Sequence, residues 1–337
     1  MQENVMLAPL TTLQVGGAAR FFVEAKSETE IIKAVKWCQE VDLPIFILGG
    51  GSNVLISDNG FDGLVLKIDL NGIEQKGEVI IAQAGEDWDE FVKYCVDNNL
   101  QGIECLSGIP GLVGGTPVQN VGAYGQEVSE TIEKVRVFDQ KSGEILELTN
   151  QDCKFSYRTS IFNSTKKNRF IVLAVTFKLI SNGEPKIAYK DLQNYFGDKQ
   201  PNLAEARKAV CKIRAEKAML VRQGGLDSQS AGSFFKNPIV TNERFSEIQQ
   251  KFGDRVPNFK FDENSVKIPA AWLIENAGFA KGFQLGNAGL STKHTLAITN
   301  RGNANAAEIL QLKTKIQETV KTKFGIELFP EPVFIGF

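Results

Sequence analysis

The sequence contains a single histidine, His294, among 337 residues. One histidine excludes a metal centre built from several histidines. Because no Gly-x-Ser-x-Gly motif is present either, the sequence also argues against a Ser-His-Asp hydrolase. We therefore expect His294 to be structural or exposed, and we expect no bound metal.

Disulfide and zinc signatures are missing too. The five cysteines form an odd number and show no Cys-x-x-Cys spacing, which is typical of reduced thiols in a cytoplasmic protein. Charge is balanced, with 38 Lys and Arg against 40 Asp and Glu and a net charge of −2. Without a basic excess, we expect no nucleic-acid partner.

Long apolar runs are also absent. No stretch approaches the roughly 18–20 apolar residues of a membrane helix, and the first residues, MQENVMLAPL, do not resemble a signal peptide. The longest apolar stretch, Phe170–Ile180, predicts a buried strand. We expect a cytoplasmic protein with no membrane insertion and no obligatory protein partner.

Strands and helices alternate along the chain. Ser27 and Glu30 form a capping box that predicts a helix start, and Asp87–Leu100 has the apolar face of an amphipathic helix. A longer helix is predicted from Asn305 to Phe324, closed by Gly325. The final residues, IELFPEPVFIGF, predict a strand, a proline kink and a strand. The class is α/β or α+β, with a split near residue 217.

The first chemically suggestive stretch is Gly49-Gly50-Gly51-Ser52-Asn53, which follows the apolar strand Ile45–Leu48. Glycines allow backbone N–H groups to converge on an anion, and Ser52 and Asn53 add side-chain donors. A phosphate or diphosphate would fit, but a tight turn between strands explains the motif equally well. The pattern matches neither a Rossmann fingerprint nor a P-loop.

A second glycine-rich stretch runs from Gly108 to Gly125 and contains six glycines. So much glycine beside apolar residues suggests main chain lying against a flat or extended ligand. The alternative is a buried glycine-rich crossover. The ligand interpretation is favoured because two such loops occur in one region of the chain.

Three further residues have both a structural and a chemical interpretation. Arg158, in FSYRTS, could bind a carboxylate with two hydrogen bonds, although a surface ion pair explains an isolated arginine better. Glu331, between two prolines, forms either a rigid exposed turn, which the sequence alone favours, or a positioned acid. Ser233, in SAGSFFKNP, either caps a backbone group or takes part in chemistry.

Seven stretches together resemble the UDP-N-acetylenolpyruvoylglucosamine reductase family of bacterial peptidoglycan synthesis, in its tyrosine-bearing type. They run in the family's order from about residue 10 to 336: TTLQVGGAARFF, ILGGGSNVLISD, IPGLVGGTPVQNVGAYGQEV, FSYRTSIF, AGSFFKNPIV, AAWLIENAG and FPEPVFIG. Each stretch is weak evidence alone, but seven in order are specific.

The resemblance implies an α+β protein with a vanillyl-alcohol-oxidase-type FAD-binding fold. Two α/β lobes, residues 1–70 and 71–216, would hold non-covalent FAD, with a C-terminal strand at 327–337 joining the second lobe. Residues 217–326 would form a substrate domain of α+β type. In this family NADPH reduces the flavin, which then delivers hydride to the enolpyruvyl group of a UDP-sugar to give UDP-N-acetylmuramate.

Residue roles follow from the same resemblance. Ser233 matches the proton donor to the carbanionic carbon, while Arg158 and Glu331 match the pair that stabilises the enolate. A hydroxyl can serve as the acid because an enolate is a strong base. Glu331 could help only as a hydrogen-bond donor, so it must carry or share a proton at that moment.

The remaining matched positions would bind cofactor or substrate. The residues matching the FAD site are Gly49, Gly50, Gly51, Ser52, Asn53, Gly111, Gly115, Thr116, Gln119, Asn120, Gly122 and Gly125. Those matching the substrate site are Tyr189, Lys217, Asn237, Lys267 and Gln284. After Lys217 the sequence departs from many members, because AMLVRQGGLDSQSAG replaces a short Leu-Pro-Asp-Pro linker.

Two other functions are compatible with parts of this pattern. A flavin oxidase on the same fold would consume oxygen and would not need an enolpyruvyl substrate. A non-catalytic flavin- or nucleotide-binding module would keep the glycine loops but would have no need for Arg158, Ser233 and Glu331 together.

Overall fold

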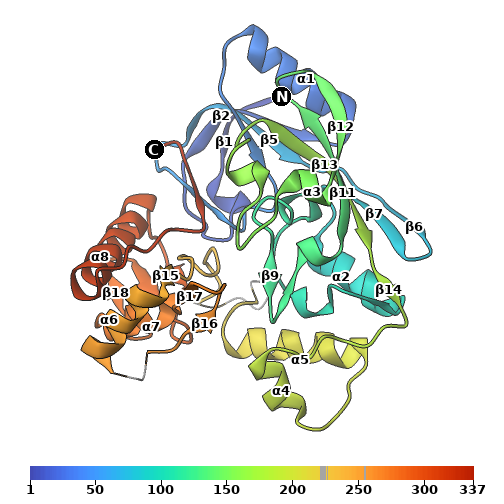
Figure 1. Cartoon of the computed structure of the whole chain (residues 1–337). Coiled ribbons are helices and arrows are strands. Elements are labelled where there is room, and N and C mark those ends of the chain that lie inside the picture. The colour runs from blue at the N-terminus through green and yellow to red at the C-terminus, as the bar shows by residue number, and fades with distance from the viewer. Residues whose placement is uncertain (221–224, 226, 254–255) are drawn as a thin grey trace. The chain divides into compact units, whose positions relative to one another are not determined.

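The computed structural model describes residues 1–220, 225, 227–253 and 256–337 (Figure 1). The chain divides into two compact units, each built from separate segments. Unit 1 comprises Met1–Val5, Ala18–Gly51 and Phe61–Leu220; unit 2 comprises Met6–Gly17, Ser52–Gly60 and Val221–Phe337. The boundary or mobile loop predicted after Lys217 lies partly outside the described residues.

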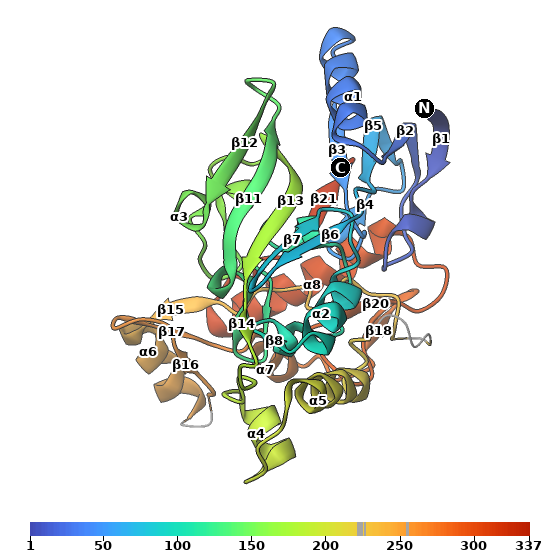
Figure 2. The same ribbon diagram turned by 90° about the vertical axis from the view of Figure 1, so that its right-hand side faces the viewer.

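The first sheet of unit 1 has the order β1-β2-β5-β3. Its strands are β1 (Gln2–Met6), β2 (Ala18–Ala25), β3 (Ile45–Leu48) and β5 (Phe61–Ile68), and the last three run parallel. Helix α1 (Glu28–Glu40) lies beside this sheet (Figure 2) and buries Ile31 and Val35. The Ser27 hydroxyl accepts the Glu30 N–H, which confirms the predicted helix start.

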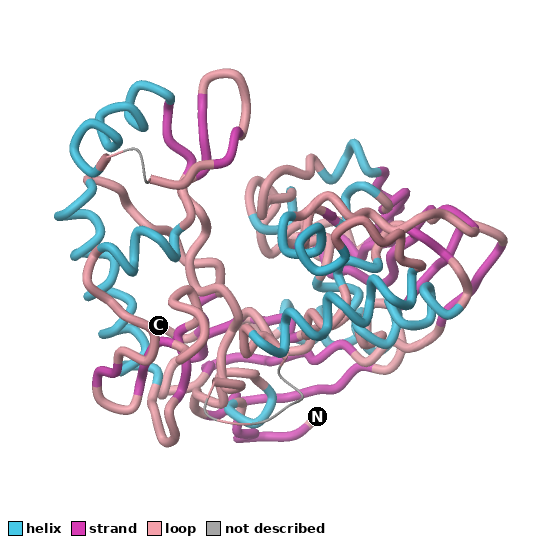
Figure 3. The backbone as a smooth tube through the Cα atoms, turned by 90° about the horizontal axis from the view of Figure 1, so that it is seen from below, coloured by secondary structure: helices cyan, strands magenta, loops and turns pink. Residues whose placement is uncertain are grey.

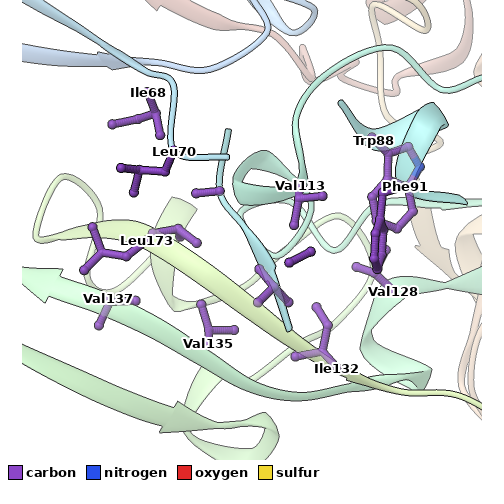
Figure 4. Packing of buried hydrophobic residues seen from close by; sticks show 14 of the residues in the cluster. Ile68, Leu70, Trp88, Phe91, Val113, Val128, Ile132, Val135, Val137 and Leu173 are labelled. Carbon is purple, nitrogen blue, oxygen red and sulfur yellow. The ribbon is translucent and has the colours of Figure 1, made fainter. Parts of the chain in front are cut away.

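The second sheet of unit 1 is antiparallel, in the order β12-β11-β13-β7-β6. Its strands are β6 (Ile73–Lys76), β7 (Val79–Gln83), β11 (Ile132–Asp139), β12 (Glu144–Thr149) and β13 (Phe170–Lys178). The central strand, β13, is buried along most of its length, as its apolar sequence predicts. Valines of β11 face the same core as Leu173, and Trp88 and Phe91 of α2 (Trp88–Asp97) lie together nearby (Figure 4).

The rest of unit 1 consists of short elements and loops, and loop forms a large share of the backbone (Figure 3). The helices are α3 (Asn150–Cys153), α4 (Lys190–Phe196) and α5 (Leu203–Glu216). The 3-10 turns of unit 1 are Glu104–Leu106, Val113–Gly115, Val128–Glu130 and Ile161–Asn163, and a further 3-10 turn, Ala8–Leu10, belongs to unit 2. The short strands are β8 (Leu100–Gln101), which pairs with β14 (Ile180–Ser181), and β9 (Gly122–Ala123), which pairs with β10 (Gln126–Glu127).

In its described residues, unit 2 gathers three small sheets and three α-helices around one core. The strands are β4 (Val54–Ile56) with β21 (Val333–Ile335); β15 (Ile239–Thr241), β17 (Ser265–Lys267) and β16 (Phe259–Lys260); and β18 (Gln284–Leu285), β19 (Ala288–Leu290) and β20 (Ile298–Asn300). The helices are α6 (Asn242–Phe252), α7 (Ala270–Asn276) and α8 (Ala306–Phe324). Gly325 ends α8 in the left-handed conformation, as predicted.

One local prediction is wrong. The residues before the Pro-Glu-Pro kink do not form a strand, although Ile326 and Leu328 are buried alternately. The Leu328 carbonyl accepts a hydrogen bond from the Gln317 side chain of α8. This segment is therefore bonded to a helix side chain rather than to the backbone of a neighbouring strand. The predicted glycine turn between strands does join β3 to β4, although β3 pairs with β5 and β4 pairs with β21. Among the described residues, no helix is long and apolar enough to cross a membrane.

Candidate active site

The two glycine-rich loops meet in unit 1. A Cβ atom added to Gly50 would lie 2.8 Å from the Gly111 Cα atom and 3.4 Å from the Leu112 nitrogen. The two main chains therefore touch at a distance that leaves no space for a side chain. Gly51 has a φ of +63°, which favours glycine for a second reason.

Two backbone donors of the first glycine loop have no protein acceptor among the described residues. Within the described part of the chain, neither the Gly50 nor the Gly51 N–H donates a hydrogen bond. Gly51 is buried, and a buried N–H without an acceptor is costly. An anionic group such as the diphosphate of FAD would supply that acceptor, so this loop fits the predicted cofactor.

Other residues predicted to bind the cofactor shape the loops. The Thr116 hydroxyl donates to the Val113 carbonyl over 2.8 Å. The buried Asn120 amide donates to Glu127 and to the Ser156 carbonyl, and its oxygen accepts the Ser129 N–H. Gly115 is exposed and open on the side where a Cβ would point.

Two more of these residues, Ser52 and Asn53, belong to unit 2. The Asn53 amide there donates to the Glu331 carbonyl.

Arg158 lies against the second glycine loop. Its guanidinium donates to the Gly122 carbonyl over 2.5 Å and to the Asn120 carbonyl over 3.4 Å. A Cβ on Gly122 would come within 3.0 Å of the Arg158 Nη1 atom, which explains the glycine at this position. Arg158 itself adopts a φ of +53°, and Asn163 holds its carbonyl. The arginine is therefore fixed on a loop of the predicted flavin site.

Two residues predicted to bind substrate, Tyr189 and Lys217, lie near each other in unit 1. The rings of Tyr124 and Tyr189 pack edge to face with centroids 5.5 Å apart. The Lys217 ammonium lies 5.9 Å from the Tyr124 ring centroid and forms a 2.5 Å ion pair with Asp191. Burial raises the pKa of Tyr124 to about 12, so its hydroxyl keeps its proton at neutral pH. Tyr124 and Asp191 were not predicted from the sequence.

Ser233 and Glu331 are brought together in unit 2. The Glu331 N–H donates to the carbonyl of Phe234, the residue after Ser233, over 2.9 Å. A β-bridge between Phe235 and Pro330 and a bond from the Lys236 N–H to Phe329 continue the pairing. On its other side the Glu331 segment leads into β21, which pairs with β4. Glu331 is half-buried, so the exposed turn favoured by the sequence alone is wrong.

The remaining predicted residues lie in unit 2. The Asn237 side chain accepts the Ala270 N–H at the start of α7. Lys267 pairs with Ile239 across β15 and β17, and its ammonium lies 5.7 Å from the Phe261 ring centroid. Gln284 is exposed and donates to the Gly286 carbonyl. His294, predicted to be structural or exposed, is half-buried and accepts the Leu296 N–H.

A buried carboxyl group, Glu104, was also missed. It is fully buried and accepts three hydrogen bonds from nitrogen donors in unit 1. The only sequence signal was an acid within the apolar run GIECLSGI, which does not by itself say what the acid contacts.

Comparison with known protein families divides the chain between two descriptions. Residues 19–149 match the family described as FAD binding domain. Residues 224–335 match the family described as UDP-N-acetylenolpyruvoylglucosamine reductase, C-terminal domain. With the glycine loops of unit 1, these matches define an FAD-dependent oxidoreductase and confirm the predicted α+β fold with an FAD-binding part.

Similar proteins extend over the whole chain. UDP-N-acetylenolpyruvoylglucosamine reductase of Streptomyces coelicolor is 43% identical over 99% of this chain and 90% of its own length. That of Thermobifida fusca is 41% identical over 99% and 98%. The crystal structure of the reductase from Thermus caldophilus matches with a TM-score of 0.70 at 25% identity, covering 99% of this chain and 98% of that one. This chain belongs to the UDP-N-acetylenolpyruvoylglucosamine reductase family.

Proposed function

We propose that this protein reduces the enolpyruvyl group of UDP-N-acetylglucosamine enolpyruvate to the lactyl ether of UDP-N-acetylmuramate, with NADPH as electron donor. Membership of the reductase family supports the reaction. The structural observation that carries the proposal is the backbone pairing between the Ser233 and Glu331 segments. This pairing brings the Glu331 backbone to Phe234, the residue after Ser233, where Phe234 and Phe235 are buried.

Different residues of this chain would act at different steps of the reaction. Bound FAD supplies the hydride, and the Gly50–Gly51 backbone would hold its diphosphate. Addition of hydride to the vinyl carbon leaves negative charge on the neighbouring carbon and its carboxylate. Arg158 would oppose that charge, and a protonated Glu331 would donate a hydrogen bond to it. Ser233 would then give its proton to the carbon.

Substrate binding and domain roles are part of the same proposal. Tyr189, Lys217, Asn237, Lys267 and Gln284 would contact the UDP-sugar, with Lys217 leaving Asp191 to approach the diphosphate. Residues 1–70 and 71–216 would form the two FAD lobes, joined by 327–337, and residues 217–326 the substrate domain. The protein would act in the cytoplasm on small molecules, without an obligatory protein partner.

The decisive experiment separates the two half-reactions in the Ser233→Ala variant. Anaerobic stopped-flow absorbance near 450 nm should show flavin bleaching by NADPH at the wild-type rate. Recovery of the band on adding the UDP-sugar should slow by about 10²–10⁴-fold, the usual contribution of a general acid. Ser230→Ala is the matched control, because Ser230 is a buried neighbour whose hydroxyl accepts the local Gly232 N–H. Its flavin band should recover at a rate within a few-fold of wild type.

Other outcomes would identify the rival functions. Recovery of the flavin band by oxygen but not by the UDP-sugar in the wild type would favour a flavin oxidase. Flavin that binds but is never reduced by NADPH would favour a binding module. Equal recovery rates in Ser233→Ala and wild type would remove Ser233 from the chemistry.

A further inference from the structure

Glu104 is a buried carboxyl group at the start of a 3-10 turn, with no exposed surface. It accepts hydrogen bonds from the Gly102 N–H at 2.9 Å, the Gln126 amide at 2.8 Å and the Lys186 N–H at 2.9 Å. Within the described residues it forms no ion pair. Burying a carboxyl group is costly unless donors surround it, so this arrangement depends on all three segments being in place.

One of these bonds fixes the short hairpin formed by β9 and β10. The Gln126 amide donates to Glu104, while its oxygen accepts the Cys105 N–H over 2.8 Å. Both ends of the Gln126 side chain are therefore held by the same turn. The hairpin between Gly122 and Gln126 carries Tyr124, and its Gly122 carbonyl holds Arg158.

A second bond fixes the segment 183–188, which has no regular secondary structure. The Lys186 N–H donates to Glu104, and the Lys186 carbonyl accepts the Cys105 thiol over 3.3 Å. Burial raises the pKa of the Cys105 thiol, so it keeps the proton that it donates. Segment 183–188 is thus fixed by the side chains of Glu104 and Cys105 rather than by pairing with a described strand.

The fixed segment leads directly to the tyrosine predicted to bind substrate. Ile187 packs into a small core with Cys105, Tyr124 and Leu192. Two residues further on, Tyr189 precedes α4 and packs against the Tyr124 ring. The positions of both tyrosines therefore depend on contacts to one turn, Glu104–Leu106.

We propose that Glu104 is a positioning residue for substrate binding, which fixes Tyr189 through Lys186 and fixes Tyr124 and Arg158 through Gln126. The proposal rests on the proposed function, since it takes Tyr189 and Arg158 as residues that meet the UDP-sugar. Glu104 acts through these residues and touches neither substrate nor cofactor itself.

The test is the Glu104→Gln variant, which keeps the shape of the side chain but replaces one accepting oxygen by an NH₂ group. That group would face an N–H donor, because Gly102, Gln126 and Lys186 all donate to Glu104. The dissociation constant of the UDP-sugar, measured from the flavin absorbance change on titration, should rise about tenfold, as expected when binding groups are misplaced. The rate of flavin reduction by NADPH should stay within about twofold.

A second readout does not depend on activity. Amide hydrogen exchange in the peptide covering 183–189 should be faster in Glu104→Gln than in the wild type, because the Lys186 N–H loses its acceptor.

Thr131→Val is the matched control. It removes a buried side-chain bond to the Val128 carbonyl in the same unit. Within the described residues the Thr131 hydroxyl bonds to neither Gln126 nor Lys186, and the substitution should leave both readouts unchanged.

Two results would overturn the proposal: a dissociation constant of Glu104→Gln within twofold of wild type, or an equal rise in the dissociation constant of Thr131→Val.

If Glu104→Gln does not fold, Cys105→Ala decides instead. It removes the thiol, which donates to the Lys186 carbonyl over 3.3 Å and lies 4.0 Å from a Glu104 carboxylate oxygen. The variant should weaken UDP-sugar binding in the same direction; unchanged binding contradicts the proposal. A wild type that never oxidises its reduced flavin with the UDP-sugar would instead contradict the proposed function.

Discussion

Gly50 shows how strongly the candidate cofactor site depends on one residue. Its backbone lies against Gly111 so closely that an added Cβ would come within 2.8 Å of the Gly111 Cα atom. Because that neighbour is main chain rather than a flexible side chain, relief requires a shift of one whole loop. Both loops carry residues predicted to bind FAD, so their separation should affect FAD binding directly.

We therefore predict that Gly50→Ala weakens FAD binding by about 10–100-fold, which corresponds to the ~1–3 kcal/mol cost of overpacking. The measurement is a fluorescence titration of apoprotein with FAD. Gly143→Ala is the control, because it places a side chain at another glycine with positive φ, in the turn between β11 and β12, where no atom lies within 4 Å. The control should lose some stability and keep its FAD affinity. Equal affinities in both variants would contradict the loop contact.

The antiparallel sheet of unit 1 is stabilised at one end by an ion pair. Asp139, the last residue of β11, is 1% exposed and lies opposite the start of β13. Arg169 donates to it with two nitrogens, at 2.6 Å and 3.0 Å, and the Lys141 N–H donates as well. The hydrogen bond from Arg169 is the main reason that the pKa of Asp139 falls to about 2 from 3.8.

This pair predicts a pH-dependent stability. The folded-state pKa lies below the unfolded one, so the contribution is complete above about pH 4 and is lost as the pH falls toward 2. Asp139→Asn should lower the free energy of unfolding by up to about 2 kcal/mol at pH 7. The difference in unfolding free energy between the variant and the wild type should be smaller at pH 3. Urea unfolding at both pH values measures it.

Glu144→Gln is the matched control for this prediction. Glu144 lies directly opposite Asp139 on β12 but is exposed, so its substitution should change little at either pH. If Asp139→Asn lowered the free energy of unfolding equally at pH 7 and pH 3, the result would contradict the ionic origin of the effect.

At the scale of the whole molecule, unit 2 is not a continuous stretch of chain. Its core contains Leu13, Val15 and Leu55, all buried, together with residues beyond 230. Strand β21 has β4 as its only partner among the described strands. The Asp58 carboxyl group accepts the N–H groups of Ala306 and Ala307 at the start of α8. Unit 2 therefore needs the two early segments Met6–Gly17 and Ser52–Gly60.

We predict that the fragment 221–337 does not fold cooperatively by itself. It would lack the segments Met6–Gly17 and Ser52–Gly60 that complete its core. Circular dichroism during heating should show no sigmoidal transition, and a dye that binds exposed apolar surface should bind the fragment more strongly than the full chain. A cooperative transition at the temperature of the full chain would show that the two segments are dispensable.

Local patterns predicted many elements correctly. The capping box at Ser27 and the glycine after Phe324 marked a helix start and a helix end, because capping depends on neighbouring residues. The apolar run Phe170–Ile180 marked the central strand, observed as Phe170–Lys178, since burial on both faces requires an apolar sequence. The segment Ile326–Phe329 was mistaken for a strand, because its alternating apolar residues do not reveal what lies beside it. In the structure its neighbour is a side chain of α8 and not another strand.

The candidate site was predictable only in part. Gly50, Arg158, Ser233 and Glu331 were singled out from motifs and from the family resemblance. Glu104 and Tyr124 were not, because their importance lies in partners distant along the chain.

The sequence by itself determined where most helices and strands form and the family to which the chain belongs, and it singled out the residues proposed to bear the chemistry. These are properties of short stretches and of their order. Only the tertiary structure decided that Gly50 touches Gly111, that Glu331 pairs beside Ser233, and that Glu104 joins Gln126 to Lys186. Such contacts form when the core closes and brings distant segments together, and no local pattern of residues encodes which segments will meet.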